Sequence, residues 1–270
     1  MFRGLRPMQQ SDESFLARLV TSARARVANG YYDVMVEKRG RRLSLAGSLV
    51  RGGRIPIIAE VKFRSPADGR LTEPKSVREV AETYEEGGAS GISVLTEPEH
   101  FDGRLDYILT VKQAAGIPVL MKDIFVDELQ VTAADRLGAD AVLLIVGVFA
   151  DGGAAIGLER MLASVHAKGM EALVEVHDED ELAIALSSSA DVVGINNRNL
   201  SDLSVSLDVS RRLLRKGPFA KPVICESGIR TRDQIESLVA LGAGGFLVGS
   251  ELMKSGDPAG ALRILSRAGP

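Results

Sequence analysis

The sequence predicts an α/β fold, a (β/α)8 TIM barrel with an N-terminal helical extension. Three observations predict it: short apolar runs rich in Val, Ile and Leu, helical segments between these runs, and a chain of 270 residues. Parallel strands that are buried on both faces appear in a sequence as continuous apolar runs without clean alternation. A single barrel of this kind takes roughly 250 residues, so the length fits one such domain.

Eight apolar runs follow one another from Arg54 onward, and we expect each to form a parallel strand. They are Pro56–Lys62, Gly91–Leu95, Pro118–Lys122, Asp140–Val146, Glu171–Val176, Asp191–Asn196, Pro222–Glu226 and Gly245–Val248. Segments with a helical spacing of apolar residues lie after them. These are Val77–Glu86, Leu105–Ala114, Asp127–Leu137, Leu158–Ala167, Asp180–Ala185, Ser206–Leu214, Arg232–Val239 and Pro258–Leu265. Eight consecutive βα units favour a closed barrel.

A doubly wound open sheet is the competing α/β architecture. It usually has fewer strands and carries a glycine-rich phosphate turn after the first one. Here the first run is followed by Lys62-Phe63-Arg64-Ser65-Pro66, which is not a dinucleotide-binding fingerprint. The candidate phosphate glycines come late in the chain, which favours the barrel.

Residues 1–48 precede the barrel domain, which we place at 49–270. Ser14–Ala28 has a helical apolar spacing, and Leu43–Val50 is short enough for a second small helix. Two interpretations of the extension stay open. It closes the bottom of the barrel, or it covers the mouth of the active site.

Composition excludes several classes of protein. A formal net charge of −3 and a pI near 5.8 lack the basic footprint of a nucleic-acid binder. We expect no membrane partner, because no apolar stretch approaches the roughly 20 residues of a membrane span and Met1–Gln10 has no signal-peptide core. The one cysteine, Cys225, fits a reducing compartment. The expectation is a cytoplasmic protein that is a monomer or a weak homo-oligomer.

Polar residues end many of the apolar runs, and in a barrel these strand ends form the catalytic face. They are Glu60 and Lys62 after the first run, Lys122 and Asp123 after the third, Glu175 and His177 after the fifth, Asn196 to Arg198 after the sixth, and Glu226 with Ser227 after the seventh. Charged residues are almost never buried unpaired, so two lysines and three glutamates around one barrel must pair with each other. Such pairs shift pKa values and serve acid–base chemistry, although some could simply satisfy one another in the core.

Two late glycine turns predict a phosphate site. Gly228 follows the seventh run and Gly249 with Ser250 follows the eighth, each just before a helix. Glycine lets backbone N–H groups approach an anion, and barrel phosphate sites recur in the loops after strands 7 and 8. Ser65 in the first loop is a candidate additional donor. The substrate partner is therefore expected to be a small phosphorylated molecule.

Other conspicuous residues have simpler interpretations. His100 and His166 lie far apart with no cysteine or histidine at ligand spacing, so we expect no metal. His177 precedes an acidic helix start and is first a capping or rim residue. Cys225 lies inside a predicted strand, where a buried small hydrophobe is expected rather than a nucleophile.

Five segments resemble indole-3-glycerol phosphate synthase in order and spacing. They are Ile58–Lys62 (IAEVK) with Ser65-Pro66, Ile92–Thr96 (ISVLT), Pro118–Asp123 (PVLMKD), Gly194–Leu200 (GINNRNL) and Glu226–Ile229 (ESGI). The resemblance runs from about Arg54 to Met253, and the first and fourth segments discriminate most. It implies ring closure of 1-(2-carboxyphenylamino)-1-deoxyribulose 5-phosphate to indole-3-glycerol phosphate in tryptophan biosynthesis, with loss of carbon dioxide and water and without cofactor or metal.

The resemblance also implies roles for individual residues. Lys122 matches the general acid at the substrate carbonyl, and Glu175 matches a carboxylate that assists proton removal during dehydration. The remaining matches are Lys62 and Glu60 as a strand-1 pair in which the lysine faces the substrate carboxylate and takes part in proton transfer, Asn196 and Arg198 as orienting residues, Glu226 and Ser227 as polar groups at the strand-7 rim, and Ser65, Gly228, Gly249 and Ser250 as phosphate ligands.

Two positions depart from the family pattern. Ile124 stands where phenylalanine usually supplies an aromatic wall, and Phe63 occupies a position that is often basic or small. Side chains alternate along a strand, so Ile124 should face the same side as Lys122, and Phe125 should not replace the missing ring.

Two alternative functions share some of these features. Another sugar-phosphate barrel such as a phosphoribosyl isomerase would share the late phosphate loops, but the lysine of the third run with glutamates in the first and fifth argues against it. A catalytically silent barrel that binds a phosphorylated metabolite is disfavoured by retention of Lys62, Lys122 and Glu175 together.

Overall fold

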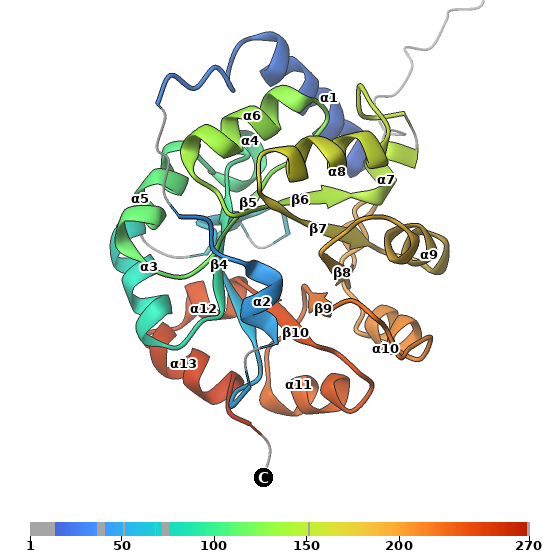
Figure 1. The fold of residues 1–270 in the computed structure, drawn as a ribbon. Coiled ribbons are helices and arrows are strands. Elements are labelled where there is room, and N and C mark those ends of the chain that lie inside the picture. Colours follow the sequence, from blue (N-terminus) through green and yellow to red (C-terminus); the bar gives the residue numbers. More distant parts are fainter. Residues whose placement is uncertain are drawn as a thin grey trace, which may run out of the picture.

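The computed structural model describes residues 14–36, 41–50, 52–67, 69–71, 76–150 and 152–268. Eight parallel strands close a barrel, each paired with the next along the chain and the last with the first (Figure 1). They are β1 (Ile57–Val61), β4 (Gly91–Leu95), β5 (Val119–Lys122), β6 (Ala141–Ile145), β7 (Glu171–Val176), β8 (Val192–Asn196), β9 (Val223–Glu226) and β10 (Gly245–Val248). The barrel prediction is confirmed, and an open doubly wound sheet is excluded.

Helices surround the barrel in the expected places (Figure 1). They are α3 (Val77–Glu86), α5 (Asp106–Ala114), α6 (Glu128–Leu137), α8 (Leu158–Ala167), α9 (Glu179–Ser187), α10 (Asp208–Leu214), α11 (Arg232–Val239) and α13 (Pro258–Leu265). Local signals fix their ends. Asp127 and Gln130 form a capping box at the start of α6, and Gly138 ends that helix with a φ of 86°.

Short elements inside the βα loops were not predicted. They are α4 (Pro98–Phe101), α7 (Val146–Ala150), α12 (Ser250–Lys254) and a small hairpin of β2 (Arg64–Ser65) and β3 (Gly69–Arg70). None of these five elements is longer than five residues, so none carries a usable hydrophobic period. Within the described ranges, no helix is long and apolar enough to cross a membrane.

Alternation along the strands builds two hydrophobic layers and one polar layer. Outward side chains such as Ile57 and Ala59 pack against the helices, whereas Ile58 points into the barrel. The inward core contains Ile58, Leu120, Leu143, Leu173, Ile224 and Leu247. Two residues further along four of these strands stand Glu60, Lys122, Glu175 and Glu226. The charged groups therefore lie directly above an apolar floor, toward the C-terminal ends of the strands.

The two helices of the N-terminal extension lie at opposite ends of the barrel. Helix α1 (Phe15–Ala28) reaches the C-terminal ends, where the N–H of Leu16 donates to the carbonyl of Leu200 at 2.9 Å. Helix α2 (Leu45–Leu49) lies at the other end, where the N–H of Ala46 donates to Glu171, the first residue of β7, at 2.8 Å. Each interpretation of the extension is thus correct for one helix. Residues 1–13 and 37–40 of the predicted extension fall outside the described part.

Candidate active site

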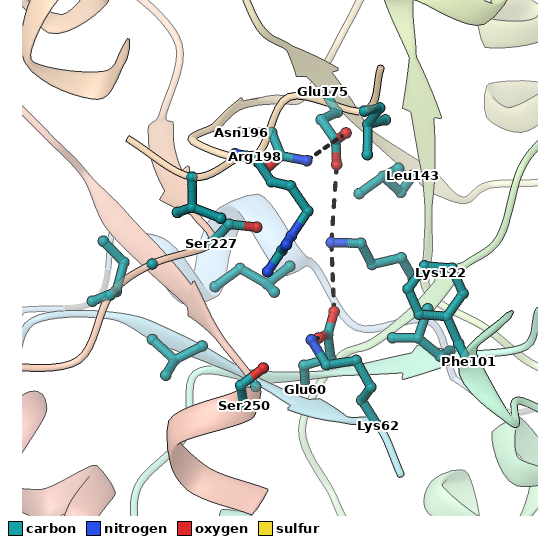
Figure 2. Close-up of a pocket in the computed structure, with 18 of the residues that line it drawn as sticks. Glu60, Lys62, Phe101, Lys122, Leu143, Glu175, Asn196, Arg198, Ser227 and Ser250 are labelled. Atoms are coloured by element: carbon teal, nitrogen blue, oxygen red, sulfur yellow. Dashed lines mark hydrogen bonds and ion pairs between the residues drawn. The ribbon is translucent and has the colours of Figure 1, made fainter. Parts of the chain in front are cut away.

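A cavity of about 440 Å³ opens at the C-terminal ends of the strands (Figure 2). This volume is in the range that holds a small organic ligand. Eleven of the predicted site residues line it: Glu60, Lys62, Lys122, Ile124, Glu175, Asn196, Arg198, Ser227, Gly228, Gly249 and Ser250. Most of the predicted site residues therefore lie around one cavity, because consecutive strand ends meet at one rim.

Lys122 lies at the centre of the charged layer. Its Nζ is 2.8 Å from Glu226, 3.5 Å from Glu60 and 3.9 Å from Glu175. Figure 2 shows the lysine between Glu175 and Glu60, with Lys62 beside the latter. The ammonium of Lys62 is 2.6 Å from Glu60. Two ammonium groups thus face three carboxylates in a largely buried space.

This imbalance determines the protonation of the cluster. Burial alone would raise the pKa of Glu60, but Lys62 and Lys122 outweigh it and lower that pKa. Burial would lower the pKa of Lys122, but Glu226, Glu60 and Glu175 raise it well above its usual value. Burial, reinforced by Glu226, raises the pKa of Glu175 to about 8. The carboxyl group of Glu175 can therefore gain or lose a proton near neutral pH.

Asn196 orients the titrating carboxylate. Its Nδ2 donates to Oε1 of Glu175 at 2.9 Å (Figure 2), and its Oδ1 accepts from the backbone N–H of Arg198 at 2.9 Å. The guanidinium of Arg198 is anchored in turn, because it donates to the carbonyl of Leu203 at 3.0 Å. A fixed amide on one carboxylate oxygen leaves the other free to face a ligand or Lys122.

Two predicted residues stand behind the cavity wall rather than in it. Glu226 is fully buried, is not among the described residues that line the cavity, and contacts Lys122. Gly194 makes room for it, since a Cβ there would lie 2.2 Å from the Glu226 carboxylate. Ser65 is also buried, and its Oγ accepts from the N–H of Ala67 at 3.3 Å. Direct substrate contact by either residue stays a prediction.

The loops after β9 and β10 form the polar end of the cavity. Ser227 and Gly228 have φ values of 62° and 76°, and Gly249 and Ser250 begin the short helix α12. A Cβ at Gly249 would lie 2.5 Å from Glu60, so this loop packs directly against the charged layer. Arg230 and Lys254 also line this end. Sequence reasoning missed both, although each lies within a few residues of a predicted glycine turn.

The opposite wall is apolar and contains an aromatic ring that the sequence did not reveal. Phe101 of α4 lines the cavity beside Lys122 (Figure 2), together with Leu19 of α1 and Leu143. Ile124 also lines it, whereas Phe125 packs in the outer core, as the alternation predicted. Phe63 packs edge-to-face on Tyr107, with ring centroids 5.9 Å apart. Among the described residues that line the cavity, Phe101 supplies the ring that position 124 lacks.

A second buried charge network fixes α1 over the mouth. Arg26, 6% exposed, lies 2.9 Å from Glu97 and 3.7 Å from Asp123, which also accepts from Thr96 at 2.6 Å and Tyr32 at 3.1 Å. Asp123 lines the cavity with the other predicted strand-end residues, and its side chain also belongs to this network.

The histidines and the cysteine take structural places. Glu97, Glu99 and His100 bring possible metal-ligand atoms together, but the guanidinium of Arg26 already supplies positive charge to both glutamates. The Nδ1 of His177 lies 2.9 Å from the carbonyl oxygen of Asn196, at the rim as expected. Cys225 is buried in β9, which confirms its assignment to the core.

The family model and the similar proteins all point to one protein family. The family model described as indole-3-glycerol phosphate synthase matches residues 17–265. "Indole-3-glycerol phosphate synthase 2" of Streptomyces coelicolor is 43% identical over 211 residues, covering 78% of this chain and 80% of the relative. The protein named indole-3-glycerol phosphate synthase in Methanopyrus kandleri is 43% identical over 241 residues, covering 85% and 89%.

Solved structures agree on the fold. An N-acetylmannosamine-6-phosphate 2-epimerase from Clostridium perfringens superposes with a TM-score of 0.58 at 17% identity, covering 80% of this chain and 93% of that chain. A thiamine phosphate pyrophosphorylase from Pyrococcus furiosus gives a TM-score of 0.59 at 20% identity, covering 78% and 93%. At these identities the likeness concerns the barrel alone.

Proposed function

Because the chain belongs to the indole-3-glycerol phosphate synthase family, we propose that its barrel mouth converts 1-(2-carboxyphenylamino)-1-deoxyribulose 5-phosphate to indole-3-glycerol phosphate. The protein is then a carboxy-lyase of tryptophan biosynthesis. The observation that carries the proposal is Lys122, held among three carboxylates in a cavity with one apolar and one polar end. Such a cavity suits a substrate with an aromatic ring at one end and a phosphate at the other.

Ring closure requires an acid at the substrate carbonyl, and Lys122 has that role. Its three carboxylate neighbours keep the ammonium charged, so the group enters the reaction with a proton to donate. As the aromatic carbon attacks the carbonyl carbon, the developing oxygen anion takes this proton and becomes a hydroxyl group.

Decarboxylation requires the substrate carboxylate to be held while its bond to the ring breaks. Lys62 lines the cavity with its ammonium 2.6 Å from Glu60 and supplies the positive charge for that carboxylate. Loss of carbon dioxide leaves its bonding electron pair to the ring, which neutralises the cationic nitrogen formed on closure.

Dehydration requires a base that removes a proton from the carbon next to the departing group, and an acid that gives the hydroxyl group a proton so that it leaves as water. The Lys62 ammonium, which lines the cavity, is the acid that protonates the departing hydroxyl group. Glu175, oriented by Asn196, is the base, and a pKa of about 8 places its titration close to neutral pH. These steps move only protons and electron pairs, so the proposal needs no cofactor.

We also propose a cytoplasmic enzyme that is a monomer or a weak homo-oligomer.

We propose that the polar end of the cavity binds the substrate phosphate through the N–H groups of Gly228, Gly249 and Ser250, with Ser65 as a further candidate donor. A substitution at Gly228 tests this proposal. Gly228→Val should raise KM by at least about tenfold, because a Cβ there meets Val205 at 2.7 Å and the φ of 76° disfavours a β-branched residue. Steady-state kinetics check this. Gly242→Val, at an open turn with a φ of 101°, is the matched control and should leave KM unchanged. Equal KM values for both variants would show that the phosphate binds elsewhere.

Phe101 tests the apolar end. Phe101→Leu should raise KM by about two- to tenfold with little change in kcat, since a lost ring–ring contact costs about 0.5 to 1.5 kcal/mol beyond area burial. Phe63→Leu removes a ring that packs on Tyr107 instead and is the control, with KM unchanged. A larger effect from Phe63 than from Phe101 would place the aromatic end of the substrate outside this wall.

Turnover itself separates the candidate functions. The purified chain should generate indole fluorescence from the carboxyphenylamino substrate and should not isomerise a phosphoribosyl substrate. Binding without turnover would instead indicate a silent metabolite-binding barrel.

A further inference from the structure

The loop after β9 has an unusual backbone. Ser227 and Gly228 both have positive φ, at 62° and 76°, and both line the cavity. Glycine adopts this region freely, but a serine does so at a cost and persists there only when its surroundings hold it. The neighbours that hold Ser227 therefore control where the N–H groups of this loop point.

Asn197 provides the hydrogen bonds. It is 1% exposed, and within the described part of the chain it is not a cavity-lining residue. Its Nδ2 donates to the carbonyl of Ser227 at 3.1 Å and to that of Glu226 at 2.9 Å. Its Oδ1 accepts from the N–H of Ser210 in α10 at 3.0 Å. One buried amide thus joins the end of β8, the start of α10 and the turn after β9.

The backbone of Asn197 extends this connection to the loop that covers Gly228. The carbonyl of Asn197 accepts from the N–H of Ser206 at 3.0 Å, and the adjacent Val205 lies against Gly228 and lines the cavity. The loop at 198–207 and the turn at 227–228 are therefore both positioned from residue 197.

We infer that Asn197 is a positioning residue for phosphate binding, which it serves by holding Ser227 and Gly228 in their left-handed conformation. The inference rests on the proposed function, because it takes the turn after β9 to bind the substrate phosphate. Asn196 and Asn197 have different roles. Asn196 faces the cavity and orients Glu175, whereas Asn197 is buried and orients the turn at Ser227 and Gly228.

Binding and chemistry should respond differently to loss of this amide. The carbonyl of Glu226 has a second donor, the backbone N–H of Asn197 at 2.9 Å, and Glu226 is held in the strand ladder opposite Asn196. Ser227 lies one residue beyond the end of β9, outside that ladder. Removing the Asn197 side chain therefore releases the turn more than it releases Glu226 and its partner Lys122.

The test is a comparison of KM, kcat and the inhibition constant of inorganic phosphate in the full-length enzyme. Asn197→Ala should raise KM and the phosphate inhibition constant together by about tenfold, with kcat within about threefold of wild type. Asn197→Ser retains a hydroxyl donor and should recover part of the loss. Asp191→Ala is the matched control: at the opposite end of β8, Asp191 accepts from the N–H of Ala172 at 2.8 Å. It should lower Tm without changing either constant.

The outcomes separate this inference from the proposed function. Wild-type turnover that phosphate does not inhibit would refute the phosphate site and the inference with it. Phosphate inhibition of wild type with unchanged constants in Asn197→Ala would overturn the inference alone. A fall in kcat as large as the rise in KM would show that Asn197 has a merely structural role. An equal rise of KM in Asp191→Ala would show the same.

Discussion

Lys122→Ala is expected to reduce kcat by about 10² to 10⁴-fold while KM changes by less than about tenfold. A positioned acid contributes mainly to the transition state, where the carbonyl oxygen gains negative charge. The Lys122 ammonium is the group that contacts Glu60, Glu175 and Glu226 together, so its loss also leaves these carboxylates without their shared cation. Steady-state kinetics by product fluorescence, with circular dichroism to confirm folding, measure the effect.

Lys112→Ala provides the control for this experiment. Lys112 is also a partly buried lysine that pairs with a buried carboxylate, Asp140 at 2.7 Å, but it lies on α5, near the start of β6 at the other end of the barrel. This variant should lose stability and keep kcat. A near-normal kcat in Lys122→Ala would show that another group supplies the proton.

Glu175 should give the reaction its pH dependence. A carboxyl group with a pKa of about 8 is protonated below that pH and ionised above it. If the ionised form is the base, kcat/KM of wild type rises with pH and levels off above about 8. Glu175→Gln should lower kcat by about 10²-fold or more and abolish this rising limb. A retained limb in the variant would assign the titration to another group.

The same group should make stability depend on pH. The folded pKa of Glu175 is raised from 4.5 to about 8, so the folded state binds more protons than the unfolded state between these values. Stabilisation by this group is fully present below pH 4.5 and is lost as pH rises through about 8. Urea unfolding across this window should show a smaller fall in the free energy of unfolding for Glu175→Gln than for wild type. Equal slopes would contradict the raised pKa.

The sequence predicted the barrel and most of its rim because both depend on local periodicity. Buried parallel strands leave apolar runs, and polar residues that end such runs must meet at one edge. Glu226 shows the limit of this reasoning: its position at a strand end was evident, but its full burial depends on Gly194 of the neighbouring strand leaving space for it.

Loop residues were harder to place, since their positions depend on contacts distant in the sequence. Phe101 lies six residues beyond β4 in a helix of four residues, and no periodicity shows that its ring turns toward Lys122. Arg26 was hidden for a similar reason, because its partners Glu97 and Asp123 come from two different strand ends. The sequence allowed two interpretations of the N-terminal extension, because it does not show that the two helices lie at opposite ends of the barrel.

One measurement tests the central claim most directly: simultaneous detection of carbon dioxide and indole product from substrate labelled in its carboxyl group. The wild-type chain should release one labelled carbon dioxide for each indole ring formed, and Lys122→Ala should release neither at a comparable rate. Substrate binding without carbon dioxide release, or carbon dioxide release unaffected by loss of Lys122, would contradict the assignment of ring closure and decarboxylation to this barrel mouth.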